Sequence, residues 1–232
     1  MNLKSFGCSF IYGSELSDEI LHNPAIRQAP APSKITWPAQ LAQHLEYAYL
    51  CYARPGSGNL QIAERALTHL AVNEKALFVI NWTYIDRFDY IDLDRPSKWP
   101  GSMPWSTLMP IDESDIATTY FKELHSEIRD KLTTLMYVKL VIDTLLQKQF
   151  PFVMTYMDES MLDQRWHTTP AITELQEYIR PHLTTFDGLD FQRWAAKNGH
   201  AITSIGHPLD AAHAAAGKLM INVFDTQNTT GC

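Results

Sequence analysis

The first ten residues, Met1–Phe10, read MNLKSFGCSF, and they combine a strand with a candidate site. The short, largely apolar run Leu3–Phe6 predicts a buried strand, and it stops at Gly7-Cys8-Ser9. Small residues in this position form either a plain β-turn or a corner that holds a nucleophilic serine at the carboxyl end of a strand. The rest of the chain is needed to choose between these two interpretations.

Further short apolar runs follow, and they alternate with segments of helical periodicity. Continuous apolar character is typical of strands that are covered on both faces. Strands separated by helices predict a parallel sheet wrapped by helices on both sides, which is an α/β fold. The predicted strands are Leu3–Phe6, Tyr47–Tyr52, Ala76–Trp82, Phe150–Met157 and Ala201–Ile205; the predicted helices are Trp37–Leu45, Leu60–Leu70, one bent or two separate helices within Ile111–Gln149, Ala171–Ile179, Phe191–Asn198 and Leu209–Val223.

Length and composition indicate one globular domain. A chain of 232 residues is long enough for one substantial core and short for two. Its hydrophobic content of 45% and aromatic content of 11% are those of a packed globule. We expect a single domain over residues 1–224, followed by a flexible polar tail over residues 225–232 (DTQNTTGC).

Charge and targeting signals narrow the class of protein. Lys and Arg total 19 against 26 Asp and Glu, a net charge of −7, which argues against a general nucleic-acid binder. Residues 1–15 lack the pattern of a signal peptide, and no apolar run is long enough to span a bilayer. The cysteines Cys8, Cys51 and Cys232 form no metal-ligand or disulfide pattern. A cytoplasmic protein is the default expectation, and association with a phage-type particle is compatible with the same features.

One long segment breaks the alternation of strands and helices. Residues 92–110, DLDRPSKWPGSMPWSTLMP, contain four prolines and two tryptophans and show little periodicity. A loop of this length in a compact domain is often functional. We therefore consider a lid or a substrate-facing wall built with Trp99 and Trp105, with packing against the domain's own surface as the equal alternative.

Polar and small residues follow the predicted strands at the positions where parallel sheets bind ligands. Ser9 follows the first strand, Gly56 lies in the ARPGSGN segment after the second, and Asn81 lies at the end of the third. Asp210 and His213 open the last predicted helix at a spacing of i and i+3, which places them on one side of its first turn. Each signal alone is weak, because a serine after a strand is usually a turn or cap residue.

Together these residues match the needs of serine chemistry. A hydroxyl nucleophile must pass its proton to an imidazole, and a carboxylate that orients the imidazole supports this transfer. The tetrahedral oxyanion needs preorganised hydrogen-bond donors. We therefore expect Ser9 as nucleophile, His213 as base and Asp210 as the orienting acid, with the Ser9 and Gly56 amides and the Asn81 side chain in the oxyanion hole.

These four blocks resemble those of the SGNH hydrolases, also called GDSL-type esterases and lipases. That family has a Gly-Asp-Ser nucleophile motif, a Gly after the second strand, an Asn after the third and Asp-x-x-His near the C-terminus. The corresponding residues here are Gly7-Cys8-Ser9, Gly56, Asn81 and Asp210–His213, and the resemblance spans Leu3 to Met220. It implies a three-layer α/β/α sandwich with a mainly parallel, five-stranded, flavodoxin-like sheet, and hydrolysis of an ester through an acyl-enzyme.

The sequence also departs from the family pattern. Cys8 replaces the family's Asp, and Asn81 stands in INWT rather than in Gly-x-Asn-Asp. Cys8 itself is an alternative nucleophile, and Gly58 is an alternative to Gly56 as oxyanion donor. Asp210 would also serve as an ordinary helix N-cap, and without the family pattern His213 reads as a surface histidine.

The remaining candidates concern the substrate. Trp82, Tyr84, Arg87 and His207 follow strands and are candidates for substrate contact, with core packing, an ion pair of Arg87 to a neighbouring aspartate, or a loop role as the alternatives. No residues cluster at metal-ligand spacing, and no cofactor is expected. We expect a small-molecule or carbohydrate ester as substrate, with an O-acetylated sugar as the first choice and a short-chain lipid or a thioester as the alternatives that the resemblance also allows. A catalytically silent domain that binds a glycan or a protein partner is the rival hypothesis.

Overall fold

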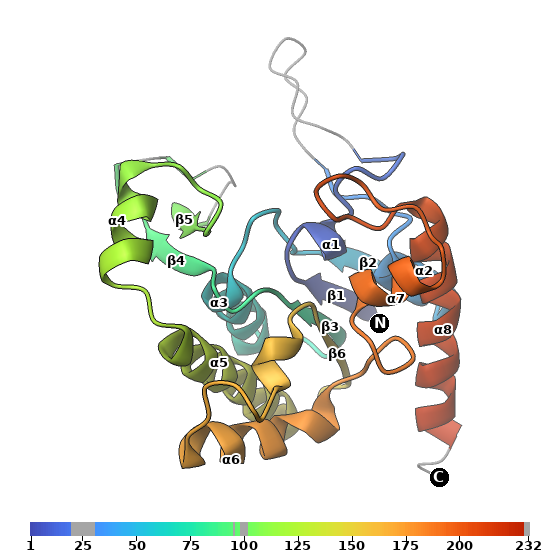
Figure 1. Ribbon diagram of the computed structural model, residues 1–232. Helices are drawn as coiled ribbons and strands as arrows, with labels where there is room; N and C mark the ends of the chain where they lie inside the picture. Colours follow the sequence, from blue (N-terminus) through green and yellow to red (C-terminus); the bar gives the residue numbers. More distant parts are fainter. Residues whose placement is uncertain (20–30, 95, 98–101, 230–232) are drawn as a thin grey trace.

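The computed structural model describes residues 1–19, 31–94, 96–97 and 102–229, and Figure 1 shows their arrangement. Its centre is a parallel sheet of β1 (Asn2–Phe6), β2 (Ala48–Cys51), β3 (Ala76–Trp82) and β6 (Phe152–Tyr156). The strand order is β2-β1-β3-β6. This order is that of a flavodoxin-like sheet, in which the first strand lies between the second and third. The predicted parallel α/β class is confirmed.

The fifth predicted strand, Ala201–Ile205, is not part of this sheet. In the structure the segment is a loop, closed by an antiparallel bridge between Ile202 and Pro208. Ile205 is 69% exposed, so the run is not the buried strand that its composition suggested. The loop's backbone bonds within itself, since Thr203 N–H donates to His207 O and Leu209 N–H donates to Ala201 O. The described sheet therefore has four strands rather than five.

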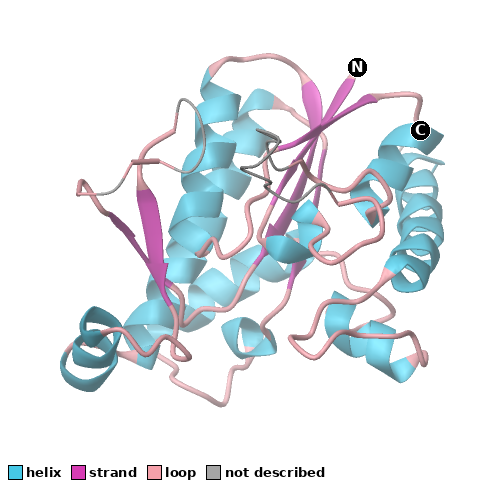
Figure 2. Cartoon of the chain, turned by 90° about the horizontal axis from the view of Figure 1, so that it is seen from above, coloured by secondary structure: helices cyan, strands magenta, loops and turns pink. Residues whose placement is uncertain are grey.

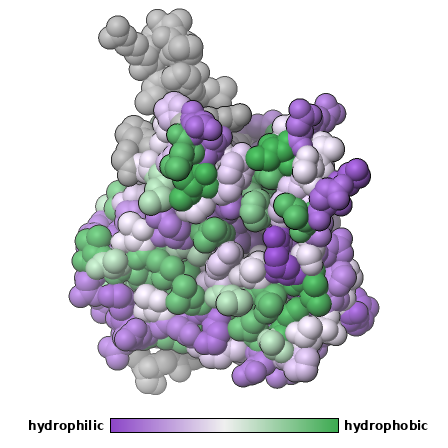
Figure 3. Space-filling model, turned by 90° about the vertical axis from the view of Figure 1, so that its left-hand side faces the viewer, coloured by the Kyte–Doolittle hydropathy of each residue, from purple (hydrophilic) through white to green (hydrophobic). Residues whose placement is uncertain are grey.

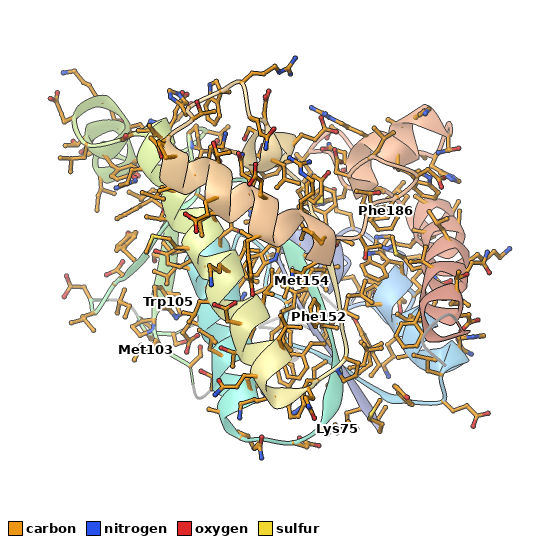
Figure 4. All side chains as sticks on the ribbon, turned by 90° about the horizontal axis from the view of Figure 1, so that it is seen from below. Lys75, Met103, Trp105, Phe152, Met154 and Phe186 are labelled. Carbon is orange, nitrogen blue, oxygen red and sulfur yellow. The ribbon has the colours of Figure 1, made fainter. Side chains whose placement is uncertain are left out.

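Helices cover both faces of the sheet, which confirms the three-layer sandwich (Figure 2). On β3, Phe78 and Ile80 face one core cluster, and Leu77 and Val79 face the other, as alternating strand side chains must. Figure 4 shows Phe152 and Met154 beside α5 and α6, and Phe186 on the opposite side near α8. The first face is covered by α3 (Asn59–Ala71), α5 (Glu127–Lys148) and α6 (Pro170–Ile179), and the second by α1 (Ser9–Tyr12), α2 (Trp37–His44), α7 (Phe191–Lys197) and α8 (Asp210–Thr229).

The long predicted helical segment Ile111–Gln149 contains two helices. The first is α4 (Asp115–Glu123), and the second is α5, which begins after Ser126. The Ser126 hydroxyl caps α5 by accepting a hydrogen bond from Arg129 N–H. The last helix, α8, continues to Thr229 and includes the first residues of the expected tail, whose last residues, 230–232, lie outside the described part of the chain.

The proline-rich segment 92–110 contains a strand that the sequence did not suggest. β5 (Trp105–Leu108) pairs antiparallel with β4 (Phe88–Ile91), and this hairpin lies apart from the main sheet, with α3 between them (Figure 1). Two short 3₁₀ helices, η2 (Glu159–Leu162) and η3 (Arg180–His182), complete the described elements. Residues 95 and 98–101, including Trp99, lie outside the described residues.

Several apolar side chains of α4, of its C-cap residue and of α5 are exposed to solvent. They are Ile116 and Leu124 with Ile128, Met136 and Leu140, and hydrophobic patches are visible on this face in Figure 3. Single exposed apolar residues are ordinary at protein surfaces. No helix in the described part of the chain combines the length and the apolar character needed to cross a membrane.

The packing of Phe78 gives a test of this core. Its ring is fully buried between Phe6 and Phe150, with ring centroids 5.5 Å and 5.9 Å away. We expect Phe78→Ala to lower the free energy of unfolding by about 3–5 kcal/mol, measured by guanidinium denaturation, because it leaves a cavity at the centre of the sheet. Val72→Ala, at a side chain that is 68% exposed, should change it by less than about 0.5 kcal/mol. Equal effects of the two would contradict this packing.

Candidate active site

The segment after β1 makes a sharp corner that presents Ser9. A Cβ on Gly7 would lie 2.7 Å from Ile11 Cγ1, so this position has no room for a side chain. Cys8 is extended, with φ −99° and ψ −152°, and Ser9 then begins α1. The Cys8 carbonyl accepts hydrogen bonds from Ile11 and Tyr12 N–H, which closes the corner. Ser9 is thereby held at the carboxyl edge of the sheet, 7% exposed.

The imidazole that meets Ser9 belongs to His207. Its Nε2 lies 2.8 Å from Ser9 Oγ, and the edge of its ring packs on Phe10 with centroids 5.1 Å apart. His207 belongs to the loop between α7 and α8, which lies next to α1 in Figure 1. Gly206, just before it, has φ +95°, a conformation that favours glycine. A sharp turn in this loop thus directs His207 toward the corner.

A carboxylate completes the arrangement from an unexpected place. Glu15 Oε2 lies 2.6 Å from His207 Nδ1, and Glu15 follows α1 by only a few residues. Glu15 has φ +68°, and its N–H donates to Glu19 Oε2 at 2.7 Å. The pKa of Glu15 is lowered, first by a hydrogen bond from Thr203 and then by the hydrogen bond and charge of His207. The carboxyl group is therefore ionised at neutral pH.

These distances define a relay of three side chains. A carboxylate accepts only, so His207 Nδ1 carries the proton that bonds Glu15, and Nε2 is left as an acceptor for the Ser9 hydroxyl. This tautomer is the one that a general base needs in order to take a proton from a nucleophile. Ser9, His207 and Glu15 are together capable of activating a hydroxyl for attack.

The structure differs from the expected pairing of Ser9 with His213 and Asp210. His213 is 1% exposed, its Nδ1 accepts a hydrogen bond from Trp37 N–H at 3.2 Å, and its ring lies against Phe191. Burial lowers the pKa of His213 to about 3. His213 lies in the first turn of α8, on the side that faces α2 and α7. Its imidazole is therefore packed in the core between these helices. Asp210 Oδ1 accepts a hydrogen bond from Ser17 N–H at 3.2 Å, and the carboxylate beside the imidazole that meets Ser9 is that of Glu15.

The expected oxyanion-hole residues lie on three segments near this corner. Asn81 is 2% exposed at the end of β3, and its Oδ1 accepts a hydrogen bond from Thr155 Oγ1 at 2.8 Å. Gly56 has φ +80° in the turn after β2. The alternative donor, Gly58 N–H, is bonded to Asp89 Oδ1 at 2.9 Å, so it is already used. The alternative nucleophile, Cys8, is fully buried in the core.

A buried polar network holds the turn that carries Gly56. The Asp89 carboxylate accepts from Gly58 N–H, Gln61 and Thr107 Oγ1, and burial raises its pKa. Arg65, which is 6% exposed, donates to Ser57 Oγ at 2.8 Å and to Gly7 O at 3.4 Å. Burial lowers the pKa of Arg65 to about 10, so the group stays charged. The network connects the turn, the serine corner and the β4–β5 hairpin.

The candidate substrate residues lie in different environments. Trp82 is fully buried in the core and cannot contact a substrate, which corrects that expectation. Tyr84 OH donates to Gln192 Oε1, and Arg87 lies over the Tyr84 ring and donates to Ser57 O rather than pairing with an aspartate. Trp105 lines a cavity of about 440 Å³, together with Arg54, Gly56 and Met103 among others.

The sequence did not predict His207 as the base or Glu15 as the acid. His207 was a candidate only for substrate contact, although its place directly after a predicted strand and before the last helix was a usable signal. Glu15 carried no motif, because its role depends on a turn that only the folded chain shows. Within the described ranges, no group of three or more His, Cys, Asp or Glu residues is placed to hold a metal ion.

Comparisons with models of known protein families and with curated proteins find no match. Among solved structures, esterase EstA from Pseudoalteromonas sp. is 10% identical with a TM-score of 0.54, over 99% of this chain and 100% of that one. The acetyl xylan esterase Est2A from the rumen bacterium Butyrivibrio proteoclasticus is 11% identical with a TM-score of 0.52, over 98% of this chain and 64% of that one. A member of the lipolytic G-D-S-L family from Veillonella parvula is 10% identical with a TM-score of 0.49, over 97% and 98%. At these identities the comparisons show a shared fold: the chain has the fold of EstA and of Est2A, as the resemblance seen in the sequence implied.

The buried state of His213 predicts a pH-dependent stability. The unfolded chain binds a proton at His213 below about pH 6.5, whereas the folded chain does so only near pH 3. Folding should therefore lose stability as the pH falls through this window, by about 1 kcal/mol per pH unit from this group. Urea denaturation at several pH values should show a shallower slope for His213→Gln than for the wild type. Val72→Ala, at an exposed side chain that does not titrate, should keep the wild-type slope; a reduced slope there would argue against the assignment.

Proposed function

We propose that this protein hydrolyses carboxylic esters with Ser9 as the nucleophile, His207 as the general base and Glu15 as the orienting acid. One observation carries the proposal: His207 bridges Ser9 Oγ at 2.8 Å and Glu15 Oε2 at 2.6 Å through its two ring nitrogens. The fold shared with EstA and Est2A supports an ester hydrolase of this architecture. Fold alone does not specify chemistry, so the proposal depends on the side chains.

The reaction follows from the positions of the protons. His207 Nε2 takes the Ser9 proton as Oγ attacks the carbonyl carbon, and the carbonyl electrons move onto oxygen. The tetrahedral intermediate collapses, its bond to the alcohol oxygen breaks, and the imidazolium protonates the departing alcohol. Water then attacks the acyl-enzyme with His207 as base, and the acid leaves as Ser9 recovers its proton. Glu15 stabilises the imidazolium in both halves of the cycle.

The developing oxyanion needs donors, and we assign Ser9 N–H, Gly56 N–H and Asn81 Nδ2 to this role. The Ser9 amide lies in the first turn of α1, where backbone N–H groups lack partners within the helix. The Thr155 hydroxyl donates a hydrogen bond to Asn81 Oδ1 and so fixes the orientation of the side-chain amide. The Nδ2 group of the same amide is then the donor that we assign to the oxyanion. The polar network around Asp89 and Arg65 supports the turn that carries Gly56.

For the substrate, we propose an O-acylated carbohydrate. The cavity that contains Gly56 also contains the Trp105 ring and the Arg54 side chain, and its volume of about 440 Å³ lies in the range of small-molecule sites. An aromatic ring with polar neighbours suits a sugar ring. Est2A, which shares the fold, is an acetyl xylan esterase. In this arrangement the cavity would hold the alcohol part of the ester, beside the oxyanion hole.

The catalytic assignment is tested by p-nitrophenyl acetate hydrolysis with matched variants. We expect Ser9→Ala and His207→Ala each to lower kcat by about a thousandfold, as for loss of a triad member. Glu15→Gln should lower it substantially, while Asp210→Asn and His213→Gln should remain within a few fold of the wild type. Equal turnover by the wild type and Ser9→Ala would remove the serine mechanism. Loss in His213→Gln with retention in His207→Ala would restore the Asp210–His213 pairing.

A second measurement distinguishes a protein that has no catalytic activity from one whose nucleophile is a residue other than Ser9. A fluorophosphonate probe should modify Ser9, as read by mass spectrometry of the labelled peptide, and should fail to label Ser9→Ala. Modification at Cys8 would overturn the assignment of the nucleophile. A folded wild type that neither labels nor turns over ester would favour the silent binding domain.

The substrate assignment predicts a selective effect of Trp105→Ala. With acetylated xylo-oligosaccharide, kcat/KM should fall at least about tenfold more than with p-nitrophenyl acetate, because only the larger ester needs the ring. Met136→Ala, at an exposed side chain of α5, should change neither value. Parallel losses on both esters would count against a carbohydrate subsite in this cavity.

A further inference from the structure

Thr203 makes hydrogen bonds to two members of the relay without touching the reacting atoms. Its Oγ1 lies 2.8 Å from Glu15 Oε2, and it accepts a hydrogen bond from His207 N–H at 3.1 Å. Its own N–H donates to His207 O at 2.9 Å. Thr203 is thus bonded to the backbone of the base and to the side chain of the acid at the same time.

The direction of these bonds follows from the protons available. The His207 amide can only donate, so Thr203 Oγ1 is the acceptor in that bond. The Thr203 hydroxyl proton then points to Glu15 Oε2, which as a carboxylate can only accept. The same Oε2 receives the proton on His207 Nδ1 at 2.6 Å. One carboxylate oxygen therefore accepts two hydrogen bonds that converge from a single loop.

Glu15 needs such support because little else confines its carboxylate. Its side chain is 41% exposed, whereas that of His207 is 11% exposed. An exposed glutamate loses rotamer freedom when it is held in one position, and water competes for its oxygens. A second fixed donor offsets this cost and favours the rotamer that faces the imidazole.

We propose that Thr203 is a positioning residue that fixes the Glu15 carboxylate against His207 through its hydroxyl. This inference rests on the proposed function, because it assigns a role in orienting the base of that same relay. Thr203 acts through Glu15, and it contacts neither Ser9 nor the ester. Its loss should therefore lower the rate of the chemical step and leave substrate binding intact.

The charge state of Glu15 gives a further consequence. The hydrogen bond from Thr203 is the largest cause that lowers the pKa of Glu15, and His207 adds to it. The other acidic group bonded to this turn residue is Glu19, which accepts the Glu15 N–H. Removing the hydroxyl should therefore raise the pKa of Glu15.

The test compares Thr203→Val, which keeps the shape but lacks the hydroxyl, with Thr203→Ser, which keeps the hydroxyl. We expect Thr203→Val to lower kcat on p-nitrophenyl acetate about tenfold with KM unchanged, and Thr203→Ser to remain near the wild type. The pKa of Glu15, followed by NMR titration of its carboxyl group, should be raised in Thr203→Val only. Thr144→Val is the matched control, because the Thr144 hydroxyl bonds only its own helix, at Leu140 O.

A double-mutant cycle separates positioning from general destabilisation. If Thr203 acts through Glu15, adding Thr203→Val to Glu15→Gln should cause almost no further loss. If the two losses multiply, or if Thr203→Val has wild-type kcat, the inference is overturned. Thr203→Ala serves the same comparison if the valine variant does not fold.

One readout does not depend on ester hydrolysis. A hydrogen bond from His207 Nδ1 to a carboxylate protects that proton from exchange with water and shifts its NMR resonance downfield. This resonance should be present in the wild type and Thr203→Ser, and weakened or absent in Thr203→Val. If the wild type hydrolyses no ester, the proposed function fails while this comparison still decides whether Thr203 holds Glu15; an unchanged resonance in Thr203→Val would refute it.

Discussion

The position of β1 between β2 and β3 is the constraint on which the site depends. Because β1 pairs in parallel with both neighbours, the three strands end together at one edge, and the segments after them meet there. Ser9 and Gly56 lie on these segments, and Asn81 lies at the end of β3 itself. The corner at Gly7 is narrow enough to exclude a side chain, which sends the chain directly into α1. The serine is therefore positioned by the sheet.

The second half of the relay comes from opposite ends of the sequence. Glu15 lies just after α1, and His207 lies 192 residues later, in the loop before α8. The packing of α8 against α2 brings that loop to the corner. Asp210 contributes to the same approach, because its carboxylate accepts the Ser17 N–H and so fixes the turn that carries Glu15. The carboxylate of the predicted Asp-x-x-His pair thus supports the relay indirectly, through the backbone of the turn that carries Glu15.

The sequence was most informative where burial dominates. Short apolar runs predicted β1, β3 and β6, which are largely buried, because a strand covered on both faces is mostly apolar. A similar run predicted β2, although its side chains are only partly buried. Ala201–Ile205 has a similar apolar composition but forms a loop. Its backbone groups form hydrogen bonds with neighbouring residues of the same loop, and Ile205 faces solvent. The sequence did not predict the pairing of β4 with β5, because the prolines of residues 92–110 are typical of a loop. Composition cannot distinguish these cases, because they depend on which backbone groups pair in the folded chain.

The site was less predictable than the fold, for a related reason. Spacing placed Asp210 and His213 on one side of a helical turn, but which way that side faces depends on how α8 packs, and the structure turns His213 toward Trp37 and Phe191. Glu15 had no recognisable spacing to His207 at all. A relay requires only that its oxygen and nitrogen atoms meet at hydrogen-bond distance, and any exposed turn that reaches the imidazole can supply the acid. Separate loops can therefore exchange the carboxylate while the sheet keeps the serine in place.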